Sequence, residues 1–152
     1  MLLRAGITGF QPTISIGESG FKTVCYSSFG SNGVDIVEGL GSMKNFYECI
    51  IKLKNKRVHV LLNSHYPFVA FTSSREADEH NLPFINDIEL SKTFNQYYKV
   101  LCLEQLNEPL KYTQQGKNII IKNENTLHQD ELKQLTYWKP KTVGEIVFNY
   151  WD

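Results

Sequence analysis

The sequence has few cysteines, no long apolar run and no excess of either charge, and each absence excludes a class of protein. The three cysteines, Cys25, Cys49 and Cys102, are odd in number and widely spaced. This spacing gives no disulfide framework and favours a reducing compartment. No stretch approaches the roughly 20 apolar residues that span a bilayer, and the N-terminus has no signal-peptide pattern. We therefore expect a cytoplasmic protein with no membrane partner.

The net charge is zero, with 16 basic and 16 acidic residues. Proteins whose main partner is a phosphate backbone usually carry a basic excess, so direct nucleic-acid binding is not expected. The acids nevertheless gather in one part of the chain, where no Lys or Arg interrupts Glu76, Asp78, Glu79, Asp87 and Glu89. Such a cluster favours docking of a basic partner. A solvated loop would have the same composition.

Catalytic and metal-binding motifs are also lacking. Ser19 does not have the G-x-S-x-G spacing of a nucleophile elbow. The four histidines form no H-x-x-x-H or H-E-x-x-H arrangement. His65 and His80 flank predicted loops and could meet the loop acids in space. Cys49 and Cys102 lie among apolar residues, which predicts core positions. We therefore predict a protein that is not an enzyme and holds no cofactor and no metal.

Glycine and apolar spacing predict the first elements. Eight of the ten glycines lie in the first 41 residues, which favours strands and tight turns there. Strands are expected at Thr13–Ile16 and Phe21–Tyr26, with a turn at 17–20 between them. A helix is expected at Met43–Leu53, because Ser42 is a suitable N-cap and an apolar stripe follows it.

The remaining elements follow from the same signals. In chain order they are strands at 58–62 and 67–72, a loop at 73–87, a short helix at 91–98, strands at 99–103 and 118–121, a helix at 126–138 and a last helix opened by a capping box at Thr142–Glu145. Together they predict one α+β domain over residues 1–152. Its sheet is mostly antiparallel, with about three helices packed on it.

The C-terminal segment from Tyr137 to Asp152 is the densest aromatic stretch and contains both tryptophans. Chain ends usually fray and become polar unless they are held by the fold. We therefore expect this segment to pack into the core.

Two other binding modes remain open. Gly39–Lys44 lies at the start of a predicted helix, where free amides would suit an anion or nucleotide; a glycine turn followed by a serine cap would give the same letters. Lys52, Lys54, Lys56 and Arg57 could contact RNA, with aromatic residues available for stacking. The helix dipole equally explains basic residues at a helix end.

The features that remain are those of a binding module. Its surface would consist of the five acids together with Tyr97 and Tyr98 as aromatic anchors. The chain size and the terminal segments Trp138–Pro140 and Phe148–Asp152 resemble small immunity proteins of bacterial polymorphic-toxin systems, including contact-dependent growth inhibition. The resemblance implies a cytoplasmic protein that binds one cognate toxin domain, often a nuclease, and blocks its active site. The acids would then face a basic toxin surface.

Overall fold

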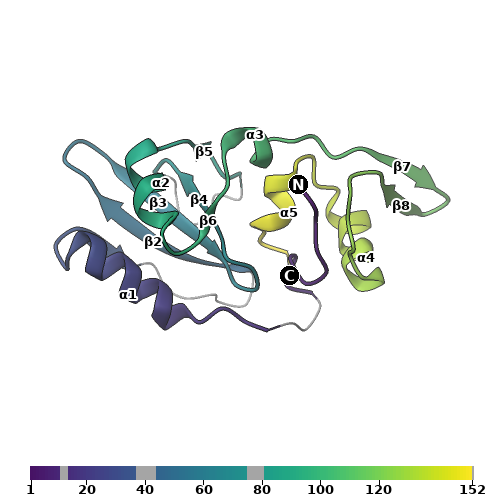
Figure 1. Ribbon diagram of the computed structural model, residues 1–152. Coiled ribbons are helices and arrows are strands. Elements are labelled where there is room, and N and C mark those ends of the chain that lie inside the picture. The colour runs from purple at the N-terminus through teal and green to yellow at the C-terminus, as the bar shows by residue number, and fades with distance from the viewer. Residues whose placement is uncertain (11–13, 37–43, 75–80, 152) are drawn as a thin grey trace.

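The computed structural model describes residues 1–10, 14–36, 44–74 and 81–151, and its elements form the α+β arrangement that the sequence predicts (Figure 1). These ranges contain a six-stranded sheet, a separate two-stranded hairpin and five helices, where about three helices were expected. The elements are α1 (Glu18–Phe29), β1 (Val34–Ile36), β2 (Phe46–Lys52), β3 (Arg57–Asn63), β4 (Phe68–Thr72), β5 (Phe84–Ile85), α2 (Ile88–Phe94), β6 (Lys99–Val100), α3 (Leu103–Leu106), β7 (Tyr112–Gln115), β8 (Asn118–Ile121), α4 (Gln129–Trp138) and α5 (Val143–Val147).

The main sheet is antiparallel from β1 to β5 in sequence order, and β6 joins β4 in parallel. Its centre is the pairing of β2 with β3 and of β3 with β4, where Leu61 lies opposite both Glu48 and Ala70. The predicted strands at 58–62, 67–72 and 118–121 are confirmed as β3, β4 and β8. These strands combine β-branched or aromatic residues with clear turn signals on both sides.

The predicted strand at Phe21–Tyr26 is wrong, because these residues belong to helix α1. Phe21 and Cys25 are buried one turn apart, and Phe29 packs against the same core one turn further on. The spacing of four residues is that of a helix face. The turn expected at 17–20 is instead the start of α1. Of the strand expected at Thr13–Ile16, residue 13 lies outside the described residues and residues 14–16 are not in a strand.

The predicted helix at Met43–Leu53 is also wrong, because its centre is strand β2; Met43 and Ser42 lie outside the described residues. The apolar positions that suggest a helical stripe belong to a strand covered on both faces, in which five of seven residues are buried. A short, nearly continuous apolar run fits a buried strand as well as a buried helix. The ladder to β3 therefore decides between them.

One face of the sheet packs against α1 and α2 and forms the sheet–helix core. This core is almost entirely apolar, apart from two thiols. Phe94 of α2 contacts Phe29 of α1 and Phe71 of β4 through their rings, with centroids 6.0 and 5.8 Å away. Its buried members are Phe21, Cys25, Val34, Tyr47, Cys49, Ile51, Val58, Val60, Leu62, Val69, Phe71, Leu90 and Phe94.

The opposite face of the sheet packs against both ends of the chain and forms the terminal core. Leu3 and Ile7 from the start of the chain meet Ile146 and Phe148 from its end, and all four are at most 1% exposed. Figure 1 shows both termini beside α5, between the main sheet and α4. The expectation that the aromatic C-terminal segment packs into the core is thus confirmed for Val143 and Ile146–Phe148, whereas Tyr137 and Trp138 at the start of the segment are exposed.

Three buried asparagines, Asn45, Asn63 and Asn149, join the sheet to the two chain ends; we call them the asparagine seam. The side-chain amides of Asn45 and Asn63 both donate to the carbonyls of Ile7 and Val147, at 2.7–3.0 Å. Asn149 donates to the carbonyl of residue 8, and its backbone amide donates to Asn45. The seam satisfies backbone groups that neither helix nor sheet reaches, as burial requires.

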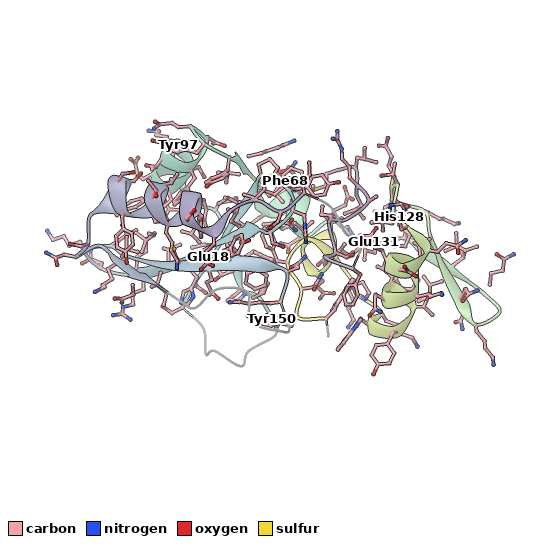
Figure 2. All side chains as sticks on the ribbon, turned by 90° about the horizontal axis from the view of Figure 1, so that it is seen from below. Glu18, Phe68, Tyr97, His128, Glu131 and Tyr150 are labelled. Atoms are coloured by element: carbon pink, nitrogen blue, oxygen red, sulfur yellow. The ribbon has the colours of Figure 1, made fainter. Side chains whose placement is uncertain are left out.

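Glu131 of α4 holds the N-terminal segment in the same way. The carboxylate is fully buried and accepts hydrogen bonds from the Gly6 amide at 2.9 Å, the Thr8 hydroxyl at 2.6 Å and the His128 amide at 2.9 Å. Figure 2 shows Glu131 close to His128, the N-cap residue just before α4. This buried acid fixes the path of residues 6–8 across the terminal core.

Several smaller predictions are confirmed with shifted boundaries. The helix expected at 91–98 is α2 and begins three residues earlier, because Asp87 is its N-cap. The strand expected at 99–103 is the two-residue β6, since α3 begins at Leu103. The loop expected at 73–87 contains β5 near its end; residues 75–80 lie outside the described residues. Thr142 caps α5 as expected, but the Glu145 carboxylate accepts from the amide of residue 141 instead of closing the box.

None of the helices in the described ranges has both the length and the hydropathy needed to cross a bilayer.

Candidate functional site

The described part of the predicted partner surface lies on α2 and the turn that follows it. Ile88 is 74% exposed and Tyr97 is 53% exposed, and the Glu89 side chain between them in sequence is 84% exposed. We call these three residues the α2 surface. Single exposed apolar side chains are common on protein surfaces, and Ile14 and Tyr137 are more exposed still. The α2 surface differs from these in that its apolar groups accompany an exposed carboxylate within the predicted partner segment. Ile88 was not among the predicted partner-binding residues, because the spacing of apolar residues does not say which face of α2 is covered by the rest of the fold.

Asp87, a predicted partner-binding residue, has its carboxylate committed to the fold. Its side chain is 7% exposed, accepts from the Leu90 amide at 3.0 Å and pairs with Lys56 at 2.9 Å. Burial alone would raise the pKa of the Asp87 carboxyl, but the Leu90 amide and the Lys56 ammonium outweigh it and hold that pKa below its ordinary value. Asp87 therefore joins α2 to the β2–β3 hairpin.

Tyr97 and Tyr98 differ although they are adjacent. Tyr97 points outward, and Figure 2 places it far from His128 and Glu131. Tyr98 is half-buried and contacts the Phe21 ring edge-on with centroids 6.2 Å apart; burial raises the pKa of its hydroxyl. Tyr98 is thus largely a packing residue. The other predicted acids, Glu76, Asp78 and Glu79, lie outside the described residues, as does His80.

The basic cluster predicted at a helix end lies instead at the β2–β3 hairpin, and most of its charge is paired. Lys52 and Arg57 both contact Asp35 of β1, at 3.0 and 3.2 Å, and Lys56 contacts Asp87. These pairs reduce the positive potential that an RNA backbone would meet. Of the anion-site residues Gly39–Lys44, only Lys44 is described. It pairs with Glu48 at 3.3 Å, and its ammonium lies 5.1 Å from the centre of the Phe46 ring.

The buried pair of Glu48 and His59 is a site that the sequence did not suggest. The Glu48 carboxylate lies 2.6 Å from Nδ1 of His59, and both residues are less than 10% exposed. Thr72 lies opposite His59 in the ladder and is fully buried, and its hydroxyl has no hydrogen-bond partner among the described residues. Neither residue of the pair lines the cleft described below. We assign the pair to holding β2 against β3. The only sequence signal for this pair is a single polar residue between apolar neighbours in each of the two strands.

Two of the three cysteines occupy the core, as predicted for Cys49. Cys25 of α1 and Cys49 of β2 are buried side by side in the sheet–helix core; a hydrogen bond between the thiols and their burial raise the pKa of Cys25. The prediction for Cys102 is wrong, because it is exposed at the start of α3. Its apolar neighbours Leu101 and Leu103 lie on either side of a change from strand to helix. Within the described residues, no cluster of three His, Cys, Asp or Glu could hold a metal.

A cleft of about 640 Å³ opens beside the C-terminal segment; we call it the tryptophan cleft. Both tryptophans line it, with Lys139 and Lys141 between them in sequence and Asn81 and Asn107 from preceding loops. Its volume lies in the range of ligand-binding pockets. The sequence assigned this aromatic segment wholly to the core, yet Trp138 is 38% exposed and Trp151 is half-buried.

Comparisons with known proteins give no match from which a role for these sites could be transferred. No family model, no curated protein and no solved structure matches the chain.

Proposed function

We propose that this protein is an immunity protein that binds a cognate bacterial toxin domain and blocks its active site without catalysing a reaction. The observation that carries the proposal is the α2 surface, where one helix and the turn after it carry two large exposed apolar side chains and an exposed carboxylate. This combination suits a protein partner with basic residues around an apolar pocket. The resemblance of the C-terminal segment to immunity proteins names the class of partner.

Tyr97 and Ile88 would supply most of the affinity. Aromatic residues dominate binding hot spots because one ring buries a large area and loses little conformational entropy. The backbone at Tyr97 is held in position, since the ring of the adjacent Tyr98 packs against Phe21. This backbone is therefore ordered before a partner arrives, which lowers the conformational entropy lost on binding.

Glu89 would supply electrostatic steering together with Glu76, Asp78 and Glu79. The Glu89 carboxylate lies 3.6 Å from Lys92 one turn along, and both side chains are more than 70% exposed. Exposed pairs of this kind contribute little stability, so a basic partner can displace Lys92 at small cost. Asp87 is left out of this set, because its carboxylate is occupied by Lys56 and the Leu90 amide.

The test is binding to the product of the gene directly upstream, measured by calorimetry. Tyr97→Ala is expected to weaken binding by roughly 30-fold, the effect of losing an interface anchor. The matched control is Tyr112→Ala, a residue of β7 that is 40% exposed; β7 lies at the opposite end of the molecule from α2 (Figure 1). Tyr112→Ala should leave the affinity unchanged. Absence of binding by the wild-type protein would contradict the toxin assignment, and equal affinities of the two variants would contradict the α2 surface.

Charge reversal tests the steering separately. The variant Glu76→Lys, Asp78→Lys, Glu79→Lys, Glu89→Lys keeps Asp87 and so keeps the cap of α2. Its association rate should fall about tenfold at low salt and approach the wild-type rate at high salt, since screening removes long-range attraction. An association rate that is the same for both proteins at low salt would remove the acids from the interface.

A further inference from the structure

The tryptophan cleft combines apolar rings with charged and amide groups that the described part of the fold does not use. Trp138 at the end of α4 and Trp151 in the terminal segment both line it, and their rings contact those of Tyr137 and Phe10 respectively. Trp138 is fixed further by a hydrogen bond from its indole nitrogen to Gln134 at 3.1 Å. Rigid aromatic walls of this kind favour an apolar side chain of a ligand.

Two lysines give the cleft a site for an anion. Lys139 and Lys141 are exposed, and neither ammonium forms an ion pair with any described residue. The carboxylate of Glu145, the one described acid that lines the cleft, already accepts a hydrogen bond from the backbone amide of Lys141. Lys139 ends α4 in a left-handed conformation with φ of 50°, which turns the chain so that both lysines follow the helix into the cleft wall. An incoming carboxylate would therefore find two available cations.

Two asparagines point to the kind of ligand that carries this carboxylate. Asn81 and Asn107 line the cleft, and their side-chain amides make no hydrogen bonds within the described ranges of the chain. A primary amide offers one acceptor and two donors, so it can pair with both the N–H and the C=O of a peptide group. The available amides of Asn81 and Asn107 differ in this respect from the amides of the asparagine seam, which already donate to buried backbone carbonyls. An extended peptide offers a partner to each of these groups, because its backbone pairs with the amides and an adjacent apolar side chain packs on the rings.

We propose that the tryptophan cleft binds an extended peptide segment in which Asp or Glu stands next to an apolar residue. The peptide backbone pairs with Asn81 and Asn107, the carboxylate lies between Lys139 and Lys141, and the apolar side chain packs on the tryptophan rings. The site shares no residue with the α2 surface. It can therefore be confirmed or refuted whatever the outcome of the toxin-binding test.

A random heptapeptide library displayed on phage identifies the sequences that the cleft prefers, whichever protein carries them in the cell. Selection against the wild-type protein is run beside selection against Lys139→Gln, Lys141→Gln, which removes both charges and retains most of each side chain. Peptides with Asp or Glu adjacent to Phe, Leu or Trp should be enriched on the wild-type protein and not on the variant. Enrichment of basic peptides, the same peptides on both proteins, or no enrichment would overturn the proposal.

Intrinsic fluorescence then places the peptide in the cleft, because the two tryptophans of the chain both line it. A selected peptide that lacks tryptophan should shift the emission in a saturable way. The affinity should fall about tenfold for Lys139→Gln, Lys141→Gln and for a peptide whose acids are replaced by amides, as expected for loss of charge-assisted hydrogen bonds. Lys133→Gln, an exposed position of α4 outside the cleft, should bind normally. Tighter binding of adenosine monophosphate than of the peptide would assign the cleft to a nucleotide instead.

Discussion

The two cores lie on opposite faces of one sheet and are stabilised by different means. The sheet–helix core consists of apolar side chains, two thiols and the Tyr47 ring, whose hydroxyl donates to the Ile16 carbonyl, all contributed by elements of the first two thirds of the chain. The terminal core brings together residues from both chain ends, and buried polar groups run through it: the asparagine seam and the carboxylate of Glu131. The sheet–helix core is specified mainly by the burial of apolar surface, which does not depend on direction. The terminal core depends in addition on hydrogen bonds, whose strength depends on the direction of donor and acceptor.

The largest effect is expected from a cavity in the sheet–helix core. Phe94→Ala removes a fully buried ring that contacts Phe29 and Phe71, so the free energy of unfolding should fall by about 4 kcal/mol. Urea unfolding followed by circular dichroism measures this change. Thr93→Ala, on the same helix and half-buried, serves as the control and should cost far less. A loss below about 1 kcal/mol for Phe94→Ala would show that α2 does not seal this core.

A more apolar residue should weaken the terminal core, which is the opposite of what burial alone predicts. Glu131→Leu leaves the donors of Gly6, Thr8 and His128 buried without an acceptor, so stability should fall by about 3 kcal/mol. The same unfolding measurement applies, with Lys133→Leu on the exposed face of α4 as the control. If Glu131→Leu were neutral or stabilising, the distinction between the two cores would fail.

The smallest effect concerns the rim of the sheet–helix core and depends on pH. The pKa of Asp87 is lower in the folded than in the unfolded chain, so the carboxylate stabilises the fold above the unfolded pKa of about 3.9. This contribution is lost as the pH falls through the folded pKa. Asp87→Ala should cost about 1 kcal/mol at pH 7, the usual value of a helix cap. The difference from wild type should shrink below pH 4, as measured by unfolding at pH 7, 5 and 3. A difference that does not change with pH would contradict the pairing with Lys56.

The comparison of the cores also explains where sequence reasoning failed. The segment from residue 18 to residue 52 supplies α1 and β2, and the sequence predicted the opposite type for each. Phe21, Cys25 and Ile51 carry apolar patterns that fit a short helix and a fully buried strand alike. Only the ladder of β2 with β3 and the packing of α1 across it separate the two possibilities. Later in the chain, Pro140 and the cap at Thr142 identified the last two helices, whereas Asp87 was assigned to a loop and its role as the cap of α2 was missed.

The candidate sites, like the secondary structure, were predicted in part from the sequence and in part decided by packing. The exposure of Tyr97 and the charge of Glu89 agree with the predicted surface, whereas Asp87 and Tyr98 are used mainly by the fold. The tryptophan cleft was missed because an aromatic segment gives the same signal whether its rings face the core or a cavity. The sequence likewise does not distinguish an asparagine that lines the cleft, such as Asn107, from one that belongs to the asparagine seam, such as Asn149.

By itself the sequence determined the fold class, the last two helices, three of the strands and the burial of the final helix, because caps, turn residues and apolar density act over a few neighbouring residues. The tertiary structure alone decided which face of each element is buried and which polar groups are used by the fold. Those choices depend on contacts between residues such as Gly6 and Glu131, more than a hundred positions apart, and local patterns carry no record of them.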